Sequence, residues 1–219
     1  MHRRIHNALT ALAVALILPV TASAKPAVTG AQALDASVRA HMGVLAADAM
    51  RGRGSATPDE AKAANYIAGE LKRYGIRPAG DHGGFIQLAQ LPPGAKGGAK
   101  TTVNVVGMIK GSDPKHAGEV VLLTAHLDHL GIGEPVKGDA IYNGADDDAS
   151  GVCAVPEFAR ILGAGPKPKR TVLFVLFGSE ELGSLDALWF RQHPPMPMQD
   201  IVANLRVGRE SSEKQPFGF

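Results

Sequence analysis

The feature that most limits the fold is a pair of short, largely apolar segments. Residues 119–125 (EVVLLTA) and 171–177 (TVLFVLF) are apolar at nearly every position rather than at every second one. Such segments are typical of strands that are covered on both faces, as in the parallel core of an α/β sheet. The chain therefore predicts a sheet with other layers packed on both sides.

Helical patterns precede, separate and follow these strands. Residues 33–50 carry apolar side chains at helical spacing. A second helix is predicted over residues 58–74, with Thr57 as its N-cap, Pro58 at its first position and Glu60 completing a capping box. The other predicted elements are strands at 85–91 and 102–109 and helices at 148–162 and 182–192. This alternation predicts an α/β fold, a mixed sheet with a parallel core and helices on both faces.

The N-terminus has the pattern of a targeting segment. Arg3 and Arg4 precede an apolar run at residues 8–20, and small residues at 22–24 (ASA) form a cleavage site. The run is shorter than the roughly 20 residues that span a bilayer. We therefore expect residues 1–24 to be a signal peptide, with the mature protein exported to the periplasm or the extracellular space and keeping no membrane span.

Composition excludes some functions and restricts the ligands of a metal. The 219-residue chain has a formal net charge of +2 and 5% aromatic residues, which argues against a nucleic-acid binder. Cys153 is the single cysteine and lies in an apolar run, so we expect a buried thiol, no intrachain disulfide and no cysteine-based zinc site. A metal would have to be bound by His, Asp and Glu.

Three polar clusters lie where the predicted elements end or begin. Residues 126–128 (HLD) follow the first apolar strand, residues 178–181 (GSEE) follow the second, and residues 146–148 (DDD) open the helix between them. The carboxyl ends of parallel strands meet at one edge of a sheet, so these clusters should converge. Histidine and carboxylates suit zinc, a carboxylate can bridge two metal ions, and one of two adjacent glutamates can ligate while the other accepts a proton. Each cluster alone is a common surface turn or helix start.

Three blocks then resemble a known family. Residues 124–131 (TAHLDHLG), 144–151 (GADDDASG) and 176–183 (LFGSEELG) resemble the M28 family of zinc aminopeptidases, of the secreted bacterial type, in order and spacing. The resemblance extends upstream through residues 51–54 (RGRG) and onward to about Leu205. It implies the zinc-exopeptidase fold, which is phosphorylase/hydrolase-like.

The resemblance also implies roles for individual residues. His126 would bind one zinc ion, Asp147 would bridge two, and Glu181 would bind the second. Glu180 would be the general base that takes a proton from the attacking water, and Asp128 would orient His126. The implied reaction is hydrolysis of a peptide bond next to a free N-terminus.

The remaining polar residues have simpler interpretations. His129 matches no family ligand and is expected at the rim, near substrate. His193 is expected on a surface loop, and Asp146 and Asp148 are expected to cap the helix that follows. Pro156 lies inside that helix and predicts a bend there.

The C-terminal region departs from the family. After residues 201–205 (IVANL) the family continues with a strand that carries a zinc-binding Asp, and later with a His ligand; residues 206–219 supply neither. We therefore divide the chain into the signal peptide, a partial peptidase domain at 25–205 and a divergent polar tail at 206–219. A frameshift or premature stop would explain the change, and genuine divergence is the alternative. The fold would then be incomplete at this end, with an exposed sheet edge.

Three functions follow from these patterns. The first is a metallo-aminopeptidase acting on peptides, with two zinc ions expected for the family and one or none here. The second is a truncated, non-catalytic remnant or binding domain with an incomplete metal site. The third keeps the fold but catalyses acyl transfer with one zinc. The pair Glu180 and Glu181 favours the first over the third, and the missing Asp and His favour the second for this chain.

Overall fold

The computed structural model describes residues 30–95 and 98–208. The predicted signal peptide and residues 209–219 of the predicted tail lie outside these ranges. None of the helices within the described ranges has the length and apolar character that a membrane crossing needs.

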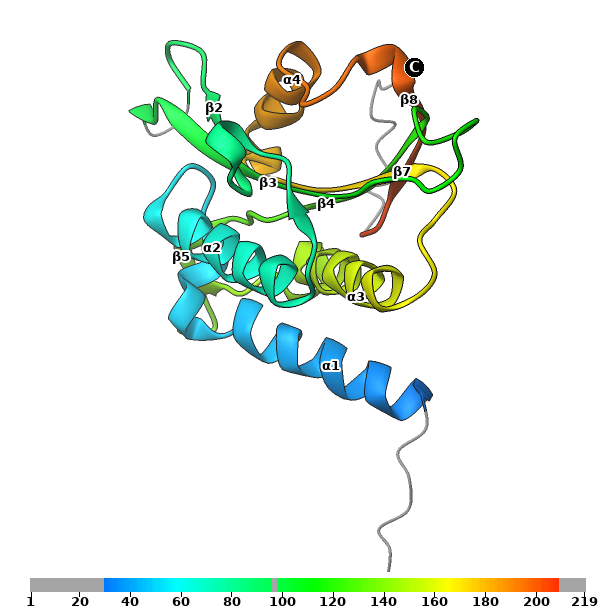
Figure 1. Ribbon diagram of the computed structural model, residues 1–219. Coiled ribbons are helices and arrows are strands. Elements are labelled where there is room, and N and C mark those ends of the chain that lie inside the picture. The colour runs from blue at the N-terminus through cyan, green and yellow to red at the C-terminus, as the bar shows by residue number, and fades with distance from the viewer. Residues whose placement is uncertain (1–29, 96–97, 209–219) are drawn as a thin grey trace, which may run out of the picture.

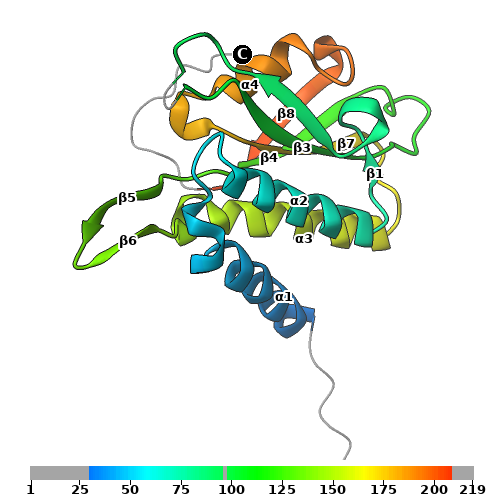
Figure 2. The same cartoon turned by 90° about the vertical axis from the view of Figure 1, so that its left-hand side faces the viewer.

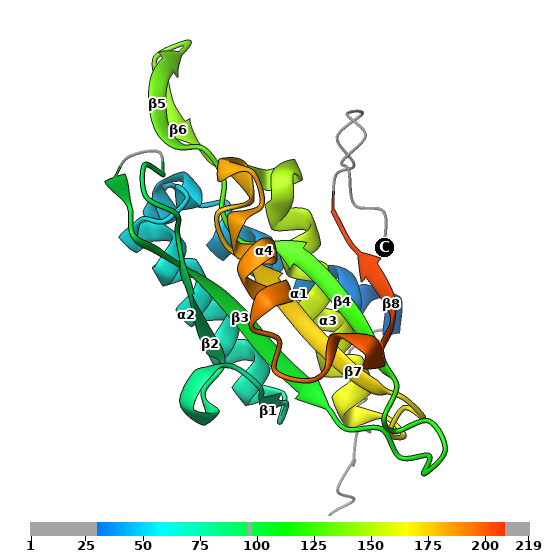
Figure 3. The same cartoon turned by 90° about the horizontal axis from the view of Figure 1, so that it is seen from above.

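A mixed sheet forms the centre of the molecule, and its strands lie in the order β1-β3-β7-β4-β8 with β2 beside β3. Strands β4, β7 and β8 are parallel, whereas β3 runs antiparallel to β7. Figure 3 shows the strands side by side from above. The strands are β1 (Arg77–Pro78), β2 (Ile86–Gln90), β3 (Thr101–Ile109), β4 (Val120–His126), β7 (Thr171–Phe177) and β8 (Ile201–Arg206).

Helices cover both faces of this sheet, as predicted. The helices α2 (Pro58–Arg73) and α3 (Ser150–Ala164) pack on one face, α1 (Gly30–Leu45) lies beneath them, and α4 (Leu185–Gln192) covers the opposite face (Figure 1). The predicted α/β class, a mixed sheet with a parallel core between helices, is therefore confirmed.

Alternation along the central strands explains their apolar sequence. In β7, Phe174 and Leu176 point into the core between the sheet and the helices α2 and α3, whereas Leu173 and Val175 pack with Phe190 of α4. All five side chains are at most 3% exposed. A strand between two helical layers needs apolar residues at every position, since both its faces are buried.

Several element boundaries differ from the predictions. The helix expected at 33–50 ends at Leu45, and a 3-10 segment, η1 (Asp48–Arg53), follows it. The helix expected from residue 148 begins at Ser150 and continues through Pro156 to Ala164. The last helix begins at Leu185 rather than at residue 182, because η5 (Glu180–Leu182) makes a separate turn.

The capping-box prediction for α2 is wrong in one of its two parts. Thr57 is the N-cap, and its side chain accepts a hydrogen bond from the N–H of Asp59. The backbone N–H of Thr57, however, donates to Gly54 O rather than to Glu60. The Glu60 carboxylate turns into the core instead, where it meets Thr102 and Ser179.

A hairpin that the sequence patterns did not predict projects from the body of the molecule (Figure 2). It consists of β5 (Gly131–Val136) and β6 (Asp139–Tyr142), which pair antiparallel. Its base packs on η1. A Cβ atom on Gly52 would lie 2.4 Å from Tyr142 O, and Gly52 has φ +68°, so only glycine fits this contact without strain.

Candidate metal centre

Two of the three polar clusters meet at the carboxyl ends of β4 and β7. His126 is the last residue of β4 and lies opposite Phe177, the last residue of β7. The N–H of Leu127 then donates to Phe177 O, which keeps the two strands joined beyond their ends. The residues after both strands therefore emerge at one edge, as the sequence predicted.

The third cluster reaches this edge through an irregular turn. A π-helical turn, η4 (Ala145–Ala149), precedes α3, and Asp147 and Asp148 within it have non-helical backbone angles. The side chain of Asp147 lies 3.1 Å (Oδ1) from His126 Nε2. We call the five carboxylates gathered here the acidic rim: Asp128, Asp147, Asp148, Glu180 and Glu181.

Asp128 is fully buried and holds the two glutamates in place. Its Oδ1 accepts a hydrogen bond from the N–H of Glu180 at 3.0 Å, and its Oδ2 accepts from the N–H of Glu181 at 3.1 Å. Oδ2 also accepts from Ser55 Oγ at 2.6 Å. Asp128 therefore positions the backbone of the η5 turn, a role that the sequence did not suggest.

His126 lies between two carboxylates. Its Nδ1 is 3.4 Å from Asp128 Oδ1, without the geometry of a hydrogen bond, and its Nε2 faces Asp147. Burial would lower the pKa of His126, but the adjacent Asp128 carboxylate, followed by the charges of Asp148 and Glu180, outweighs burial and raises this pKa to about 9. Without a metal ion, the imidazole is therefore protonated at neutral pH.

Asp148 contacts the first turn of α3, although the N-cap position is Ala149, and it also supports the site. Its Oδ1 accepts from the N–H of Gly151 at 3.1 Å, and its Oδ2 accepts from the N–H of His126 at 3.1 Å. Burial raises the pKa of Asp148 to about 6. This carboxyl group therefore ties the start of α3 to the end of β4.

His129 takes a more central place than a general rim position. Ligand atoms of His129, Asp147 and Glu181 all lie within 4.8 Å of one another, and His129 Nδ1 is 3.0 Å from Glu181 Oε1. The prediction that His129 is at the rim is correct, but its contact with Glu181 was not foreseen. The spacing of two histidines three residues apart after one strand was the available signal.

The two adjacent glutamates diverge. Ser179 adopts a left-handed conformation at φ 57°, which starts the turn of η5. Glu181 then faces His129, whereas Glu180 Oε1 lies 3.1 Å from the Arg206 Nη2 atom of β8. Arg206 is the first residue of the predicted divergent tail, and it reaches the site because β8 continues past Leu205.

The donor set fits zinc. Imidazole nitrogens and carboxylate oxygens are zinc ligands, and His129, Asp147 and Glu181 are partly rather than fully buried. The buried Nδ1 of His126 has no hydrogen-bond partner, so a ring nitrogen at this site is left without a partner of its own. The excess of carboxylates over nearby cations also favours a bound cation.

Two buried residues beside the site support its backbone, and the sequence patterns did not predict this role for either. Glu60 of α2 accepts hydrogen bonds from the backbone N–H of Ser179 at 2.7 Å and from Thr102 Oγ1 at 2.7 Å. Arg53, which is fully buried, donates to four backbone carbonyls. Those acceptors are Leu127 O, Leu45 O, Asn143 O and Gly144 O, at 2.6–2.9 Å.

The other residues singled out from the sequence lie away from the acidic rim or are buried. Cys153 is fully buried in α3, as expected. His193 is exposed at the end of α4, where its ring stacks on Trp189 with centroids 3.8 Å apart.

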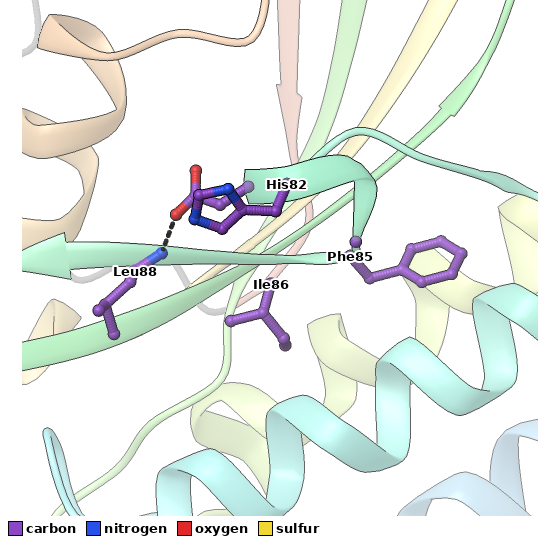
Figure 4. Close-up of a pocket in the computed structure, with 6 residues that line it drawn as sticks. His82, Phe85, Ile86 and Leu88 are labelled. Atoms are coloured by element: carbon purple, nitrogen blue, oxygen red, sulfur yellow. Dashed lines mark hydrogen bonds between the residues drawn. The ribbon is translucent and has the colours of Figure 1, made fainter.

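An open pocket lies on the turn before β2 and on β2 itself (Figure 4). Within it, the N–H of Leu88 donates to Asp81 Oδ2 at 2.8 Å. Its lining residues are Asp81, His82, Gly84, Phe85, Ile86 and Leu88. None of these belongs to the acidic rim, so the pocket is separate from the candidate metal centre.

Comparison with known families identifies the chain. The model of peptidase family M28 matches residues 104–215, which is half of the sequence and includes the whole acidic rim. The protein belongs to peptidase family M28. Aminopeptidase YwaD of Bacillus subtilis is 33% identical over 118 residues, and a probable zinc metalloprotease of Leptosphaeria maculans is 30% identical over 122 residues.

The two alignments cover 52% and 55% of this chain. They cover only 24% and 27% of the two relatives, which are much longer. Among solved structures, a Zn-dependent exopeptidase from Parabacteroides distasonis has 24% identity and a TM-score of 0.58, covering 83% of this chain and 63% of that one. BSAP, a zinc aminopeptidase from Bacillus subtilis, has 16% identity and a TM-score of 0.58, covering 79% and 68%. These likenesses show the shared fold.

Proposed function

We propose that this M28 protein is a zinc-dependent exopeptidase that hydrolyses N-terminal peptide bonds. The observation that carries the proposal is the grouping of Asp147, Glu181 and His129 at one sheet edge, where Asp147 also contacts His126. Glu180 lies on the neighbouring turn, whose backbone is held by Asp128. The named relatives, an aminopeptidase and a probable zinc metalloprotease, support the same reaction class.

In this proposal His126, Asp147 and Glu181 hold zinc, and the contact of His129 with Glu181 makes it a further candidate ligand. Zinc, when bound, would polarise the scissile carbonyl and lower the pKa of water. The Glu180 carboxylate would accept a proton as the water oxygen bonds to the carbonyl carbon. It would return that proton to the nitrogen as the C–N bond breaks, releasing the N-terminal amino acid.

The proposal includes export of the protein, and its support comes from residues 1–24 alone. Their charged start, apolar run and small-residue site support secretion to the periplasm or the extracellular space. The proposed substrates are peptides with a free N-terminus.

A second candidate is a non-catalytic domain with the same fold and an incomplete metal site. The observation that favours it is the sequence of the third parallel strand at the rim. Residues 206–208 are Arg, Val and Gly, and a Cβ atom on Gly208 would lie 2.4 Å from Asp148 Oδ1. Strand β8 therefore brings a cation, and no carboxylate, to this edge.

Metal content and turnover separate the two candidates. Zinc bound per purified chain is measured by elemental analysis, and turnover by release of the chromophore from an aminoacyl nitroanilide. The exopeptidase should bind at least one zinc ion and lose activity with a chelator. Less than one zinc per chain with no turnover would instead establish the non-catalytic domain.

Glu180→Gln tests the assigned base. We expect the variant to keep its zinc and to lose roughly 10²–10⁴-fold in kcat, the range that general base catalysis contributes. Glu119→Gln, on the surface at the opposite end of β4, is the matched control and should keep wild-type turnover. Unchanged turnover in Glu180→Gln would show that another group takes the proton.

A further inference from the structure

Arg206 stands at the acidic rim because of the register of β8. This strand runs parallel to β4, with Arg206 opposite Thr124, two residues before His126. The N–H of Val207 donates to Thr124 O at 2.8 Å, so the pairing continues past Arg206. The backbone of Arg206 is therefore held at this edge by hydrogen bonds of the sheet.

The guanidinium meets a carboxylate that is itself fixed. Arg206 Nη2 lies 3.1 Å from Glu180 Oε1, and the backbone N–H of Glu180 is held by buried Asp128. Arg206 therefore contacts a carboxylate of the acidic rim whose backbone is held in place.

This positive charge is permanent. A guanidinium keeps its proton at every pH at which the protein is folded, whereas a histidine can lose its proton to make room for a metal ion. A divalent cation entering the rim is therefore repelled by Arg206, and one of the two carboxylate oxygens of Glu180 is occupied by an N–H donor. The Arg206 side chain is 42% exposed, so solvent weakens this repulsion without removing it.

We propose that Arg206 is an internal cation that lowers the affinity of the acidic rim for zinc and restrains Glu180. The proposal rests on the proposed zinc site and goes beyond it, because it assigns a positioning residue to β8.

Zinc affinity tests the proposal directly. Zinc dissociation constants of the full chain and of Arg206→Gln are measured by competition with a chromophoric chelator, at low salt and at about 0.5 M salt. We expect Arg206→Gln to bind zinc about tenfold more tightly at low salt, and the difference to shrink below about threefold at high salt, since salt screens partly exposed charges. Arg206→Lys keeps the charge and should stay within about threefold of wild type.

Arg170→Gln is the matched control. Arg170 pairs with Glu119 at the opposite end of β4 and β7 and is similarly exposed, at 43%. Its loss removes the same charge from the chain, and we expect no change in zinc affinity. Circular dichroism confirms that each variant is folded.

The outcomes distinguish the two proposals. If wild type and Arg206→Gln bind zinc equally well, or the variant binds more weakly, the proposal for Arg206 is wrong and the proposed zinc site is supported. If Arg170→Gln gains as much affinity as Arg206→Gln, the effect is one of total charge and the local role is wrong. If no variant binds zinc, both proposals fail.

Discussion

Burial changes the acid–base behaviour of Glu60, the residue that supports the turn before the glutamate pair. The side chain is 1% exposed, and burial, followed by the charge of Asp128, raises its pKa from an ordinary 4.5 to about 7. The hydrogen bonds from Thr102 and Ser179 act in the opposite direction without cancelling these effects. The folded protein therefore binds a proton at Glu60 over a pH range where the unfolded chain does not.

This shift predicts that stability falls as pH rises. The contribution of protonated Glu60 is complete below about pH 4.5 and is lost as pH rises to about 7, at about 1.4 kcal/mol per pH unit and on the order of 3 kcal/mol in total. Glu60→Gln should flatten this part of the profile. Urea unfolding of wild type and Glu60→Gln between pH 4.5 and 8 measures this pH dependence of stability. The control Glu119→Gln should follow wild type. Parallel profiles for Glu60→Gln and wild type would contradict the shift.

A site residue could be recognised from the sequence where a regular pattern of elements placed it, and not where its partner is distant along the chain. His126, Asp128 and Glu181 follow apolar strands, and parallel strand ends share an edge, so their proximity could be predicted. Glu60 lies 119 residues from its partner Ser179 and has a local alternative as a helix cap. A local pattern cannot show which of the two partners the carboxylate takes.

At the scale of elements, patterns that repeat along a segment were predictive. Strand β7 has the predicted bounds, and α2 begins at the predicted residue. The hairpin of β5 and β6 was missed because residues 131–136 (GIGEPV) show no apolar alternation, and most of its side chains are exposed. The position of Arg206 was missed because a tail with no recognisable pattern still extends β8.

Arg53 joins elements that are far apart in the sequence. Its guanidinium connects the end of α1, the segment after β4 and the segment before η4 through carbonyls of Leu45, Leu127 and Asn143. The last two segments lead to Asp128 and to Asp147. The candidate metal centre therefore depends on a residue that is not one of its candidate ligands.

Arg53→Met should destabilise the protein by at least about 3 kcal/mol, because it leaves several buried carbonyls without donors. Arg53→Lys should recover little, since one ammonium cannot match the geometry of the guanidinium fork. Urea unfolding measures both. Arg39→Met, which removes an exposed pair with Asp35 on α1, is the control and should change stability by less than about 0.5 kcal/mol. A near-neutral Arg53→Met would show that water or neighbouring groups satisfy these carbonyls.

At the scale of the whole molecule, the candidate metal centre joins three parts of the chain. His126 ends β4, Asp147 lies in η4 before α3, and Glu181 lies in η5 after β7. In the metal-free protein these carboxylates repel one another, and the cations at His126 and Arg206 offset this only in part. A metal ion bound to all three segments would hold them together and reduce that repulsion.

Zinc should therefore stabilise the whole fold. A ligand that binds only the native state at 100 times its dissociation constant adds about 2.7 kcal/mol, which for a domain of this size corresponds to a rise in Tm of about 5–10 °C. Differential scanning calorimetry of chelator-treated protein with and without zinc measures the shift. Magnesium should raise Tm only slightly, because it prefers octahedral oxygen coordination. In the double variant Asp147→Asn and Glu181→Gln the shift should disappear; a full shift there would place the zinc elsewhere, because these two carboxylates supply the only negative ligand charge assigned to the site.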